Sequence, residues 1–110
     1  MGYRDASPDQ RRLLLALLAK AHLEQRFINW LDQLMVEPLD DGGMGSFRIT
    51  AAAWAERRQA GPCIAELQFE DADGVLVLAS LYADVEGQPC EVDIWKVNFE
   101  PLIRIPAQLL

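Results

Sequence analysis

Three strand-like segments in the second half of the chain constrain its fold most. Residues 63–70 alternate between apolar and polar side chains, residues 75–83 are apolar on both sides, and residues 90–97 alternate again. Alternation is typical of a strand with one buried face, and a continuous apolar run is typical of a central strand. Turn sequences at residues 71–74 and 86–89 join the three segments. Together they predict an antiparallel sheet with two consecutive hairpins.

The first third of the chain has helical periodicity instead. Ser7, Pro8 and Gln10 form a strong helix start, with a capping serine, a proline at the first helical position and a glutamine that completes a capping box. Apolar residues then recur at helical spacing, and glycine and proline are absent from residues 9–37. We expect one long helix with a kink, or two helices that meet near residues 20–23.

A further hairpin is expected between these two regions. Residues 35–39 and 47–51 are strand-like and flank a segment with three glycines. Residues 51–56 are ambiguous, because their alanines favour a helix while their position favours the end of a strand. The chain as a whole predicts one α+β domain over residues 1–110. Its N-terminal helix or kinked helix pair would pack on one face of an antiparallel sheet of about five strands.

The three glycines raise the question of a nucleotide site. A dinucleotide-binding loop needs G-x-G-x-x-G between a strand and a helix, and a P-loop needs a lysine before its serine or threonine. Gly42, Gly43 and Gly45 have a different spacing, and no lysine precedes Ser46. A tight turn that needs positive φ at several positions explains this composition, so we expect a hairpin turn and no cofactor.

Residues that could carry catalysis or bind a metal are few. The turn at residues 71–74 resembles the start of a calcium loop, but Ser80 stands where an EF-hand requires glutamate. His22 is the only histidine, and no spacing places it beside a nucleophile. Cys63 and Cys90 form no Cys-x-x-Cys pair, and on separate strands they would lie too far apart for a disulfide. We expect no metal site and two buried free cysteines.

Negative charge is concentrated in one part of the chain. The net charge is −7, and residues 63–100 carry nine acidic side chains against the single Lys96. This charge disfavours binding to DNA or RNA and favours partners with a basic surface. No apolar run approaches the roughly 20 residues of a membrane span, and the run at residues 13–19 continues into charged helical sequence. We expect a cytoplasmic protein that does not bind membranes.

Strand pairing assigns the acidic residues to one side of the sheet. We expect Phe69 to lie opposite Leu76 and Tyr82 to lie opposite Val92. The helix-facing side would then hold Cys63, Ala65, Leu67, Phe69, Leu76, Leu78, Tyr82, Val92 and Ile94. The other side would hold an apolar strip along the central strand, made by Val75, Val77, Ala79 and Leu81, between acidic neighbours. A one-residue change of register would exchange the two sides.

The acidic side of this sheet is the candidate site. The predicted partner-binding residues are Glu66, Glu91, Asp93 and Trp95, with Asp71 and Asp73 as rim charges. In one interpretation another part of the chain covers the strip and the acids are a solvated rim. In the other, the strip stays open and binds a partner through an apolar centre, an aromatic anchor and a charged edge. The principal hypothesis is a non-enzymatic, acidic protein-binding module. It would neutralise a partner with a basic surface, as immunity proteins and other inhibitors do.

Two alternatives stay open. A small-ligand binder or hydrolase-like enzyme could use a pair of strand carboxylates in a pocket between helices and sheet, lined by Trp30 or Trp54. A homodimer could instead form through the apolar strip.

Two motifs carry a resemblance to a known family. DGGMGS at residues 41–46 and DIWKV at residues 93–97, with the sequence around them, resemble a family of small bacterial proteins of unknown function. The resemblance covers residues 36–106. It implies a bacterial origin and a shared scaffold but no catalytic residues. Within these motifs, Trp95 can serve as a packing residue, and Lys96 can pair with Asp93 or a neighbouring acid.

Overall fold

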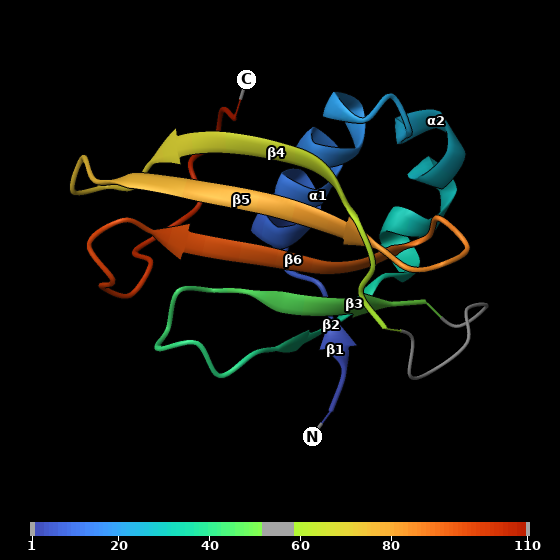
Figure 1. The fold of residues 1–110 in the computed structure, drawn as a ribbon, viewed down its shortest axis with the longest axis horizontal. Helices are drawn as coiled ribbons and strands as arrows, with labels where there is room; N and C mark the ends of the chain where they lie inside the picture. The colour runs from blue at the N-terminus through green and yellow to red at the C-terminus, as the bar shows by residue number, and fades with distance from the viewer. Residues whose placement is uncertain (1, 52–58, 110) are drawn as a thin grey trace.

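The computed structural model describes residues 2–51 and 59–109, which form a helical layer and a sheet (Figure 1). The helical elements are α1 (Pro8–Lys20), α2 (Glu24–Phe27) and the 3-10 helix η1 (Ile28–Gln33). The strands are β1 (Arg4–Asp5), β2 (Met35–Pro38), β3 (Phe47–Thr50), β4 (Cys63–Glu70), β5 (Leu76–Ala83) and β6 (Pro89–Lys96). All neighbours pair antiparallel, in the order β1-β2-β3-β6-β5-β4. The predicted α+β class is confirmed, and the described residues form six strands where about five were expected.

Helix α1 begins where the sequence predicts, and it ends at Lys20, as in the alternative of two helices that meet near residues 20–23. The N–H of Gln10 donates to Ser7 Oγ at 3.1 Å, and the N–H of Ser7 donates to Gln10 Oε1 at 2.9 Å, which completes the capping box. At the other end His22 has a φ of 59°, and the N–H of Leu23 donates to the carbonyl oxygen of Leu18. This is the geometry of a Schellman motif, which stops a helix. The buried side of α1 holds Leu13, Leu14, Ala16, Leu17 and Leu18.

The glycine-rich segment is the turn between β2 and β3, as predicted. Gly42, Gly43 and Gly45 have φ values of 76°, 83° and 97°, a region that only glycine enters without strain. The carboxylate of Asp41 accepts hydrogen bonds from the N–H groups of Met44 and Ser46, at 3.1 and 3.0 Å. The aspartate therefore holds the turn by bonds to its own backbone.

The pairing of the last three strands is shifted by one residue from the prediction in each hairpin. Phe69 lies opposite Val77, and Tyr82 lies opposite Glu91. The predicted side of β5 is therefore wrong. Val77, Ala79 and Leu81, expected as an outer strip, are fully buried in the core.

The turn geometry and one strand irregularity explain this shift. In the first, the N–H of Asp71 donates to Val75 O and the N–H of Gly74 donates to Asp71 O. The second turn, residues 84–88, repeats both bonds, and Gly87, like Gly74, has a positive φ. Each loop therefore has three residues, which sets the register of the first hairpin. In the second hairpin an irregularity between Tyr82 and Ala83 shifts the pairing once more and places Tyr82 opposite Glu91.

The helices cover only one face of the sheet, behind β4 and β5 in Figure 1. We call it the inner face, and the opposite side of β4, β5 and β6 the outer face. The core between α1 and the inner face includes Leu67, Phe69, Val77, Ala79, Leu81, Val92 and Ile94, together with Phe47 and Ile49 from β3. The ambiguous residues 52–56 lie outside the described part of the chain.

Neither cysteine forms a disulfide, as expected, but only one of them is buried. Cys90 is in the core side of β6, whereas Cys63 is exposed at the start of β4. The burial predicted for Cys63 is wrong, because a register irregularity between Cys63 and Ala65 interrupts the strand alternation there. β5 lies between the two strands that carry the cysteines.

Candidate functional site

The outer face brings together four of the predicted site residues. Across β4, β5 and β6 its two central rows are Glu66, Ser80 and Asp93, then Gln68, Leu78 and Trp95. Glu91 lies one row further along β6, opposite Tyr82 of β5 and Arg48 of β3. The predicted rows paired Glu66 with Trp95, so the register shift has moved the two strands past each other by two residues while leaving the four side chains on one face.

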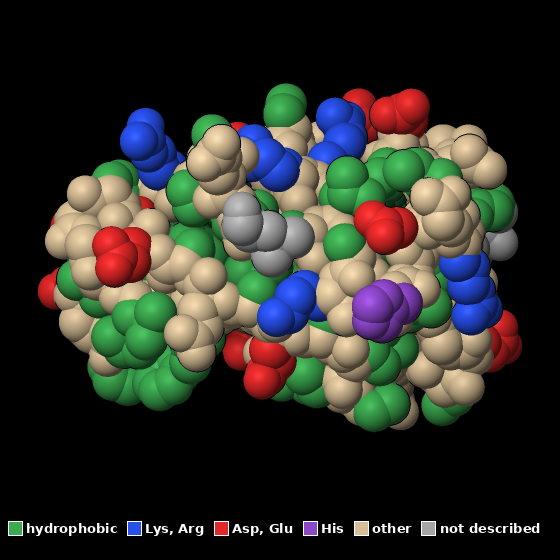
Figure 2. All heavy atoms as spheres, turned by 90° about the horizontal axis from the view of Figure 1, so that it is seen from above, with side chains coloured by type: hydrophobic (Ala, Val, Ile, Leu, Met, Phe, Trp, Pro, Cys, Tyr) green, Lys and Arg blue, Asp and Glu red, His purple; other side chains and the backbone are tan. Residues whose placement is uncertain are grey.

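This face is open to solvent. Glu66 and Asp93 are exposed, Trp95 is 41% exposed and Leu76 is 37% exposed. In the described part of the chain, the helices and the C-terminal segment lie against the inner face instead. The Trp95 ring packs at 5.8 Å between centroids against Phe99, which is itself exposed. Figure 2 shows hydrophobic side chains gathered at one end of the molecule, beside a hollow.

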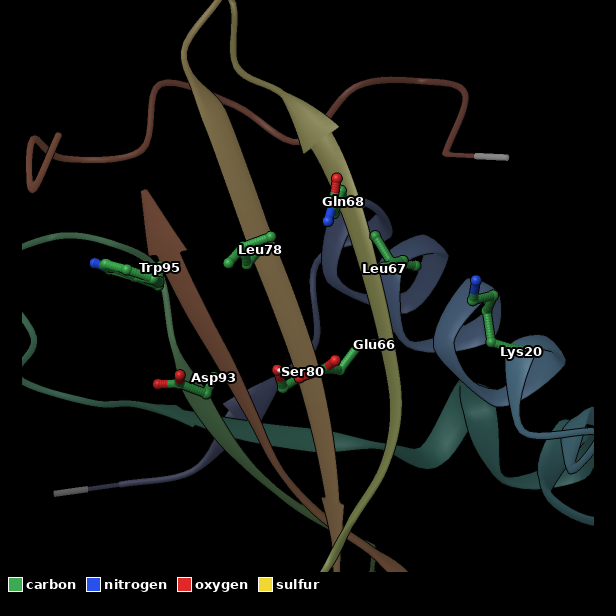
Figure 3. Close-up of a pocket in the computed structure, with 8 residues that line it drawn as sticks. All are labelled: Lys20, Glu66, Leu67, Gln68, Leu78, Ser80, Asp93 and Trp95. Atoms are coloured by element: carbon green, nitrogen blue, oxygen red, sulfur yellow. Dashed lines mark hydrogen bonds between the residues drawn. The ribbon is translucent and has the colours of Figure 1, made fainter. Parts of the chain in front are cut away.

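A depression of about 670 Å³ opens on the outer face (Figure 3). It is lined by Lys20, Glu66, Leu67, Gln68, Leu78, Ser80, Asp93 and Trp95. Ser80 lies between the two acids in the strand order, and its hydroxyl donates to Glu66 at 3.3 Å. Lys20 comes from the end of α1, on the far side of β4 (Figure 3).

This depression differs from the pocket that the enzyme alternative requires. It lies on the open side of the sheet and not between helices and sheet, and Trp30 packs against the core. The other aromatic candidate, Trp54, falls outside the described residues.

The acids of the outer face act on their neighbours. Burial raises the pKa of Tyr82, and the nearby Cys63 thiol and the carboxylates of Asp93, Glu66 and Glu91 raise it further. Ionisation of this phenol is opposed because the site already carries negative charge. Glu91 is partly compensated by Arg48, whose Nε lies 3.9 Å from its carboxylate. Within the depression, Glu66 and Asp93 are therefore the carboxylates available to a partner, although Asp93 also accepts a hydrogen bond from Ser46 Oγ at 3.4 Å.

Asp71 is an internal residue, so its prediction as a rim charge is wrong. Its side chain is 0% exposed and its Oδ2 lies 2.8 Å from Nζ of Lys96, which is itself 1% exposed. Asp73 also binds this ammonium, at 2.7 Å, although its side chain is 38% exposed. Lys96 faces inward and Asp93 outward because they are three residues apart on one strand. The suggested pair with Asp93 therefore does not form, and a neighbouring acid takes its place.

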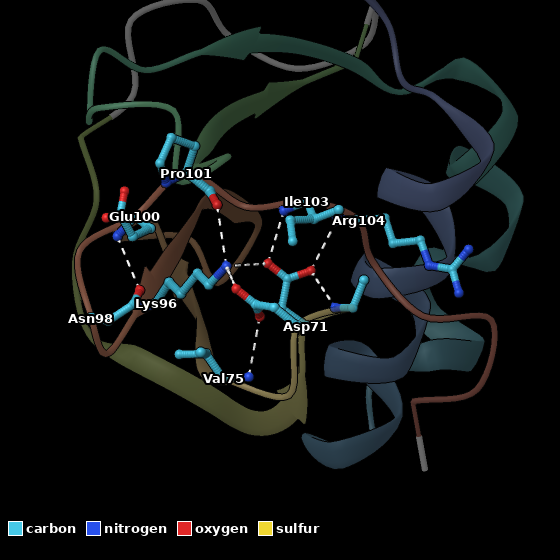
Figure 4. A network of polar contacts seen from close by, with 10 residues as sticks. Asp71, Val75, Lys96, Asn98, Glu100, Pro101, Ile103 and Arg104 are labelled. Atoms are coloured by element: carbon cyan, nitrogen blue, oxygen red, sulfur yellow. Dashed lines mark hydrogen bonds and ion pairs between the residues drawn. The ribbon is translucent and has the colours of Figure 1, made fainter.

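The Asp71 carboxylate also holds the C-terminal segment (Figure 4). The N–H groups of Ile103 and Arg104 donate to it at 2.8 and 3.1 Å, and Lys96 Nζ donates to Pro101 O at 3.4 Å. Burial alone would raise the pKa of Asp71, but these bonds and the Lys96 bond outweigh it and lower the pKa to about 2. Asp71 and Lys96 therefore serve the fold and are not free to bind a partner.

Five residues of the depression were not among the predicted site residues: Lys20, Leu67, Gln68, Leu78 and Ser80. Because the predicted register was shifted, Leu78 was assigned to the helix-facing side and Ser80 was not considered as a site residue. The signal that could have found them is the pattern Asp-x-acid-Gly, which occurs in both turns and is typical of a three-residue loop with a left-handed glycine. Lys20 comes from another layer, and no local pattern places it there.

Comparison with known proteins identifies a family. The sequence model of a domain of unknown function (DUF6984) matches residues 3–106, and the chain belongs to this family. No curated protein and no solved structure matches the chain. In residues 2–51 and 59–109 there is no group of three or more His, Cys, Asp or Glu side chains that could hold a metal ion. The same residues contain no helix that is long and apolar enough to cross a membrane.

Proposed function

We propose that this protein is a non-enzymatic binding module whose outer face binds a protein partner with a basic surface, in the manner of an immunity protein or other inhibitor. One observation carries the proposal. Two exposed carboxylates, Glu66 and Asp93, border an open depression that also holds the half-exposed Trp95.

The residues of this face supply the two components that protein interfaces use. Carboxylates attract a basic surface over a distance and raise the rate of association, while a large aromatic side chain supplies short-range affinity. The net charge of −7 strengthens the attraction. Asp71 and Asp73 are no longer part of the proposed interface, because Lys96 binds both.

The proposal is tested first by capture. The wild-type protein and the variant Glu66→Lys/Asp93→Lys serve as baits in a lysate of the source organism. The matched control is Asp40→Lys/Glu86→Lys, which makes the same change in net charge at exposed acids away from the outer face. We expect a partner that the wild type and the control retain and the outer-face variant loses.

The captured partner is then studied by stopped-flow kinetics at several salt concentrations. The outer-face variant should slow association about tenfold or more and weaken its salt dependence, and Trp95→Ala should mainly speed dissociation. Equal losses in the outer-face variant and the control would show that net charge alone matters and would overturn the proposal.

A further inference from the structure

Among the described residues, strand β4 is one edge of the sheet, and part of its backbone has no strand to pair with. In the order of the described strands, its one neighbour is β5. In an antiparallel pair, alternate residues direct their N–H and C=O groups toward the partner and away from it. The N–H of Asp71 donates to Val75 O across the hairpin, so residues 69, 67 and 65 also face β5. The N–H and C=O groups of Glu66, Gln68 and Glu70 therefore point out from the edge.

The side chains of these three residues lie on the outer face and are exposed. The depression touches Glu66, Leu67 and Gln68, three consecutive residues whose side chains alternate between the faces. A depression lined by all three continues from the outer face around the edge of β4 toward Lys20 (Figure 3). In the described chain, Figure 1 shows no strand beyond β4.

We propose that this edge binds an extended basic segment of the partner, which adds to the sheet as an antiparallel strand beside β4. This inference rests on the proposed function and specifies how the partner binds. The outward backbone groups of Glu66, Gln68 and Glu70 would give the hydrogen bonds of strand addition. Lysine or arginine at alternate positions of the segment would lie opposite the two glutamates and set its register.

The charges on β4 favour an extended basic segment over the β4 strand of a second copy of this chain. If two β4 strands paired antiparallel about Gln68, Glu66 of each copy would lie opposite Glu70 of the other. Like charges directly opposite each other are destabilising, and charged edges are a common protection against self-pairing. Lys20 lies toward the helix side of the edge, so the intervening positions of the added strand would not be basic. The expected segment alternates cationic and uncharged residues.

Two isomeric peptides test this proposal. Each is an acetylated and amidated hexapeptide in which lysine and threonine alternate. In one isomer the three lysine nitrogens are methylated, which removes the N–H groups that would bond to β4. In the other the three threonine nitrogens are methylated, which removes N–H groups that would face solvent. Charge and composition are the same, and affinity for the full-length protein is measured by calorimetry or fluorescence anisotropy.

The threonine-methylated isomer should bind at least tenfold more tightly. Hydrogen exchange of the amides of Glu66, Gln68 and Glu70 should slow about tenfold in its presence, whereas the amide of Leu67, which already bonds to β5, should not change. Equal affinities of the two isomers, or no binding of either at millimolar concentration, would overturn strand addition.

A variant of the protein gives an independent result. Gln68→Pro removes one edge N–H that makes no bond within the sheet, and Gln68→Thr keeps it. The proline variant should bind the threonine-methylated isomer at least tenfold more weakly than the threonine variant, with unchanged circular dichroism. If the proline variant unfolds, the comparison of the two isomers still decides.

The two proposals can fail separately. If the isomers bind equally but the captured partner still associates more slowly with Glu66→Lys/Asp93→Lys, strand addition is wrong and the proposed function stands. If the partner does not respond to that variant, the proposed function is wrong whatever the peptides do.

Discussion

The inner and outer faces of the sheet formed by β4, β5 and β6 use charged residues in opposite ways. Toward the inner side, Asp71 and Lys96 are almost inaccessible and bind each other and the C-terminal segment. On the outer face, Glu66 and Asp93 remain in water beside an exposed tryptophan. The excess of acids in residues 63–100 is therefore two groups with different roles, one structural and one at the surface.

The difference has a simple physical cause. A charge that leaves water must have partners, whereas an exposed carboxylate needs none. In each of the three hairpin turns of the described chain, the carboxylate of one aspartate accepts a hydrogen bond from a backbone N–H of the same turn. These aspartates are Asp41, Asp71 and Asp84. Net charge alone thus overstates the number of acids that a partner can meet.

The largest effect should come from breaking the internal ion pair. Asp71→Ala leaves the buried Lys96 with Asp73 as its one acidic partner and removes the acceptor of Ile103 N–H, so we expect a loss of about 3–5 kcal/mol of unfolding free energy. The outer-face control Asp93→Ala should change it by about 0.5 kcal/mol or less. Urea denaturation measures both. Similar losses in the two variants would contradict the division into an internal and a surface group.

Truncation of apolar residues on the same strand compares the faces directly. Leu81 is fully buried on the inner side of β5, and Leu78 is partly exposed on the outer side. Leu81→Ala should cost about 2–5 kcal/mol, because it leaves a cavity in the core. Leu78→Ala should cost about 1 kcal/mol or less. The opposite order in thermal or urea unfolding would restore the register that we predicted from the sequence.

Acid should weaken the protein partly through Asp71. Its pKa is lowered from 3.8 to about 2 in the folded state, so folding is favoured while the carboxylate is ionised. This contribution is present above about pH 4 and is lost as the pH falls toward 2, and it amounts to roughly 2 kcal/mol. Asp71→Asn should show a correspondingly smaller loss of stability over this range than the wild type. Urea titrations of both proteins at several pH values measure this difference. The same pH dependence of unfolding free energy in the variant and the wild type would argue against the role of Asp71.

Much of the candidate site could be predicted, although both hairpins were predicted one residue out of register. The two errors add up to a displacement of two residues between β4 and β6, an even number, so Glu66, Asp93 and Trp95 still share a face. The strand between them was turned over, which is why Leu78 and Ser80 were misplaced. Such errors do not change which residues of β4 share a face with which residues of β6. They do change which residues lie directly opposite one another across the sheet.

The sequence by itself determined the features that arise within a few residues of one another. Ser7 and Gln10 cap α1, and the glycines at positions 42, 43, 45 and 74 make turns, because these bonds join near neighbours in the chain. Only the tertiary structure decided the partner of Lys96 and the open side of the sheet. Asp71 meets Ile103 across 32 residues, and such contacts depend on how the strands and the C-terminal segment pack together. Local periodicity cannot encode that packing, because it specifies which residues share a side but not what covers them.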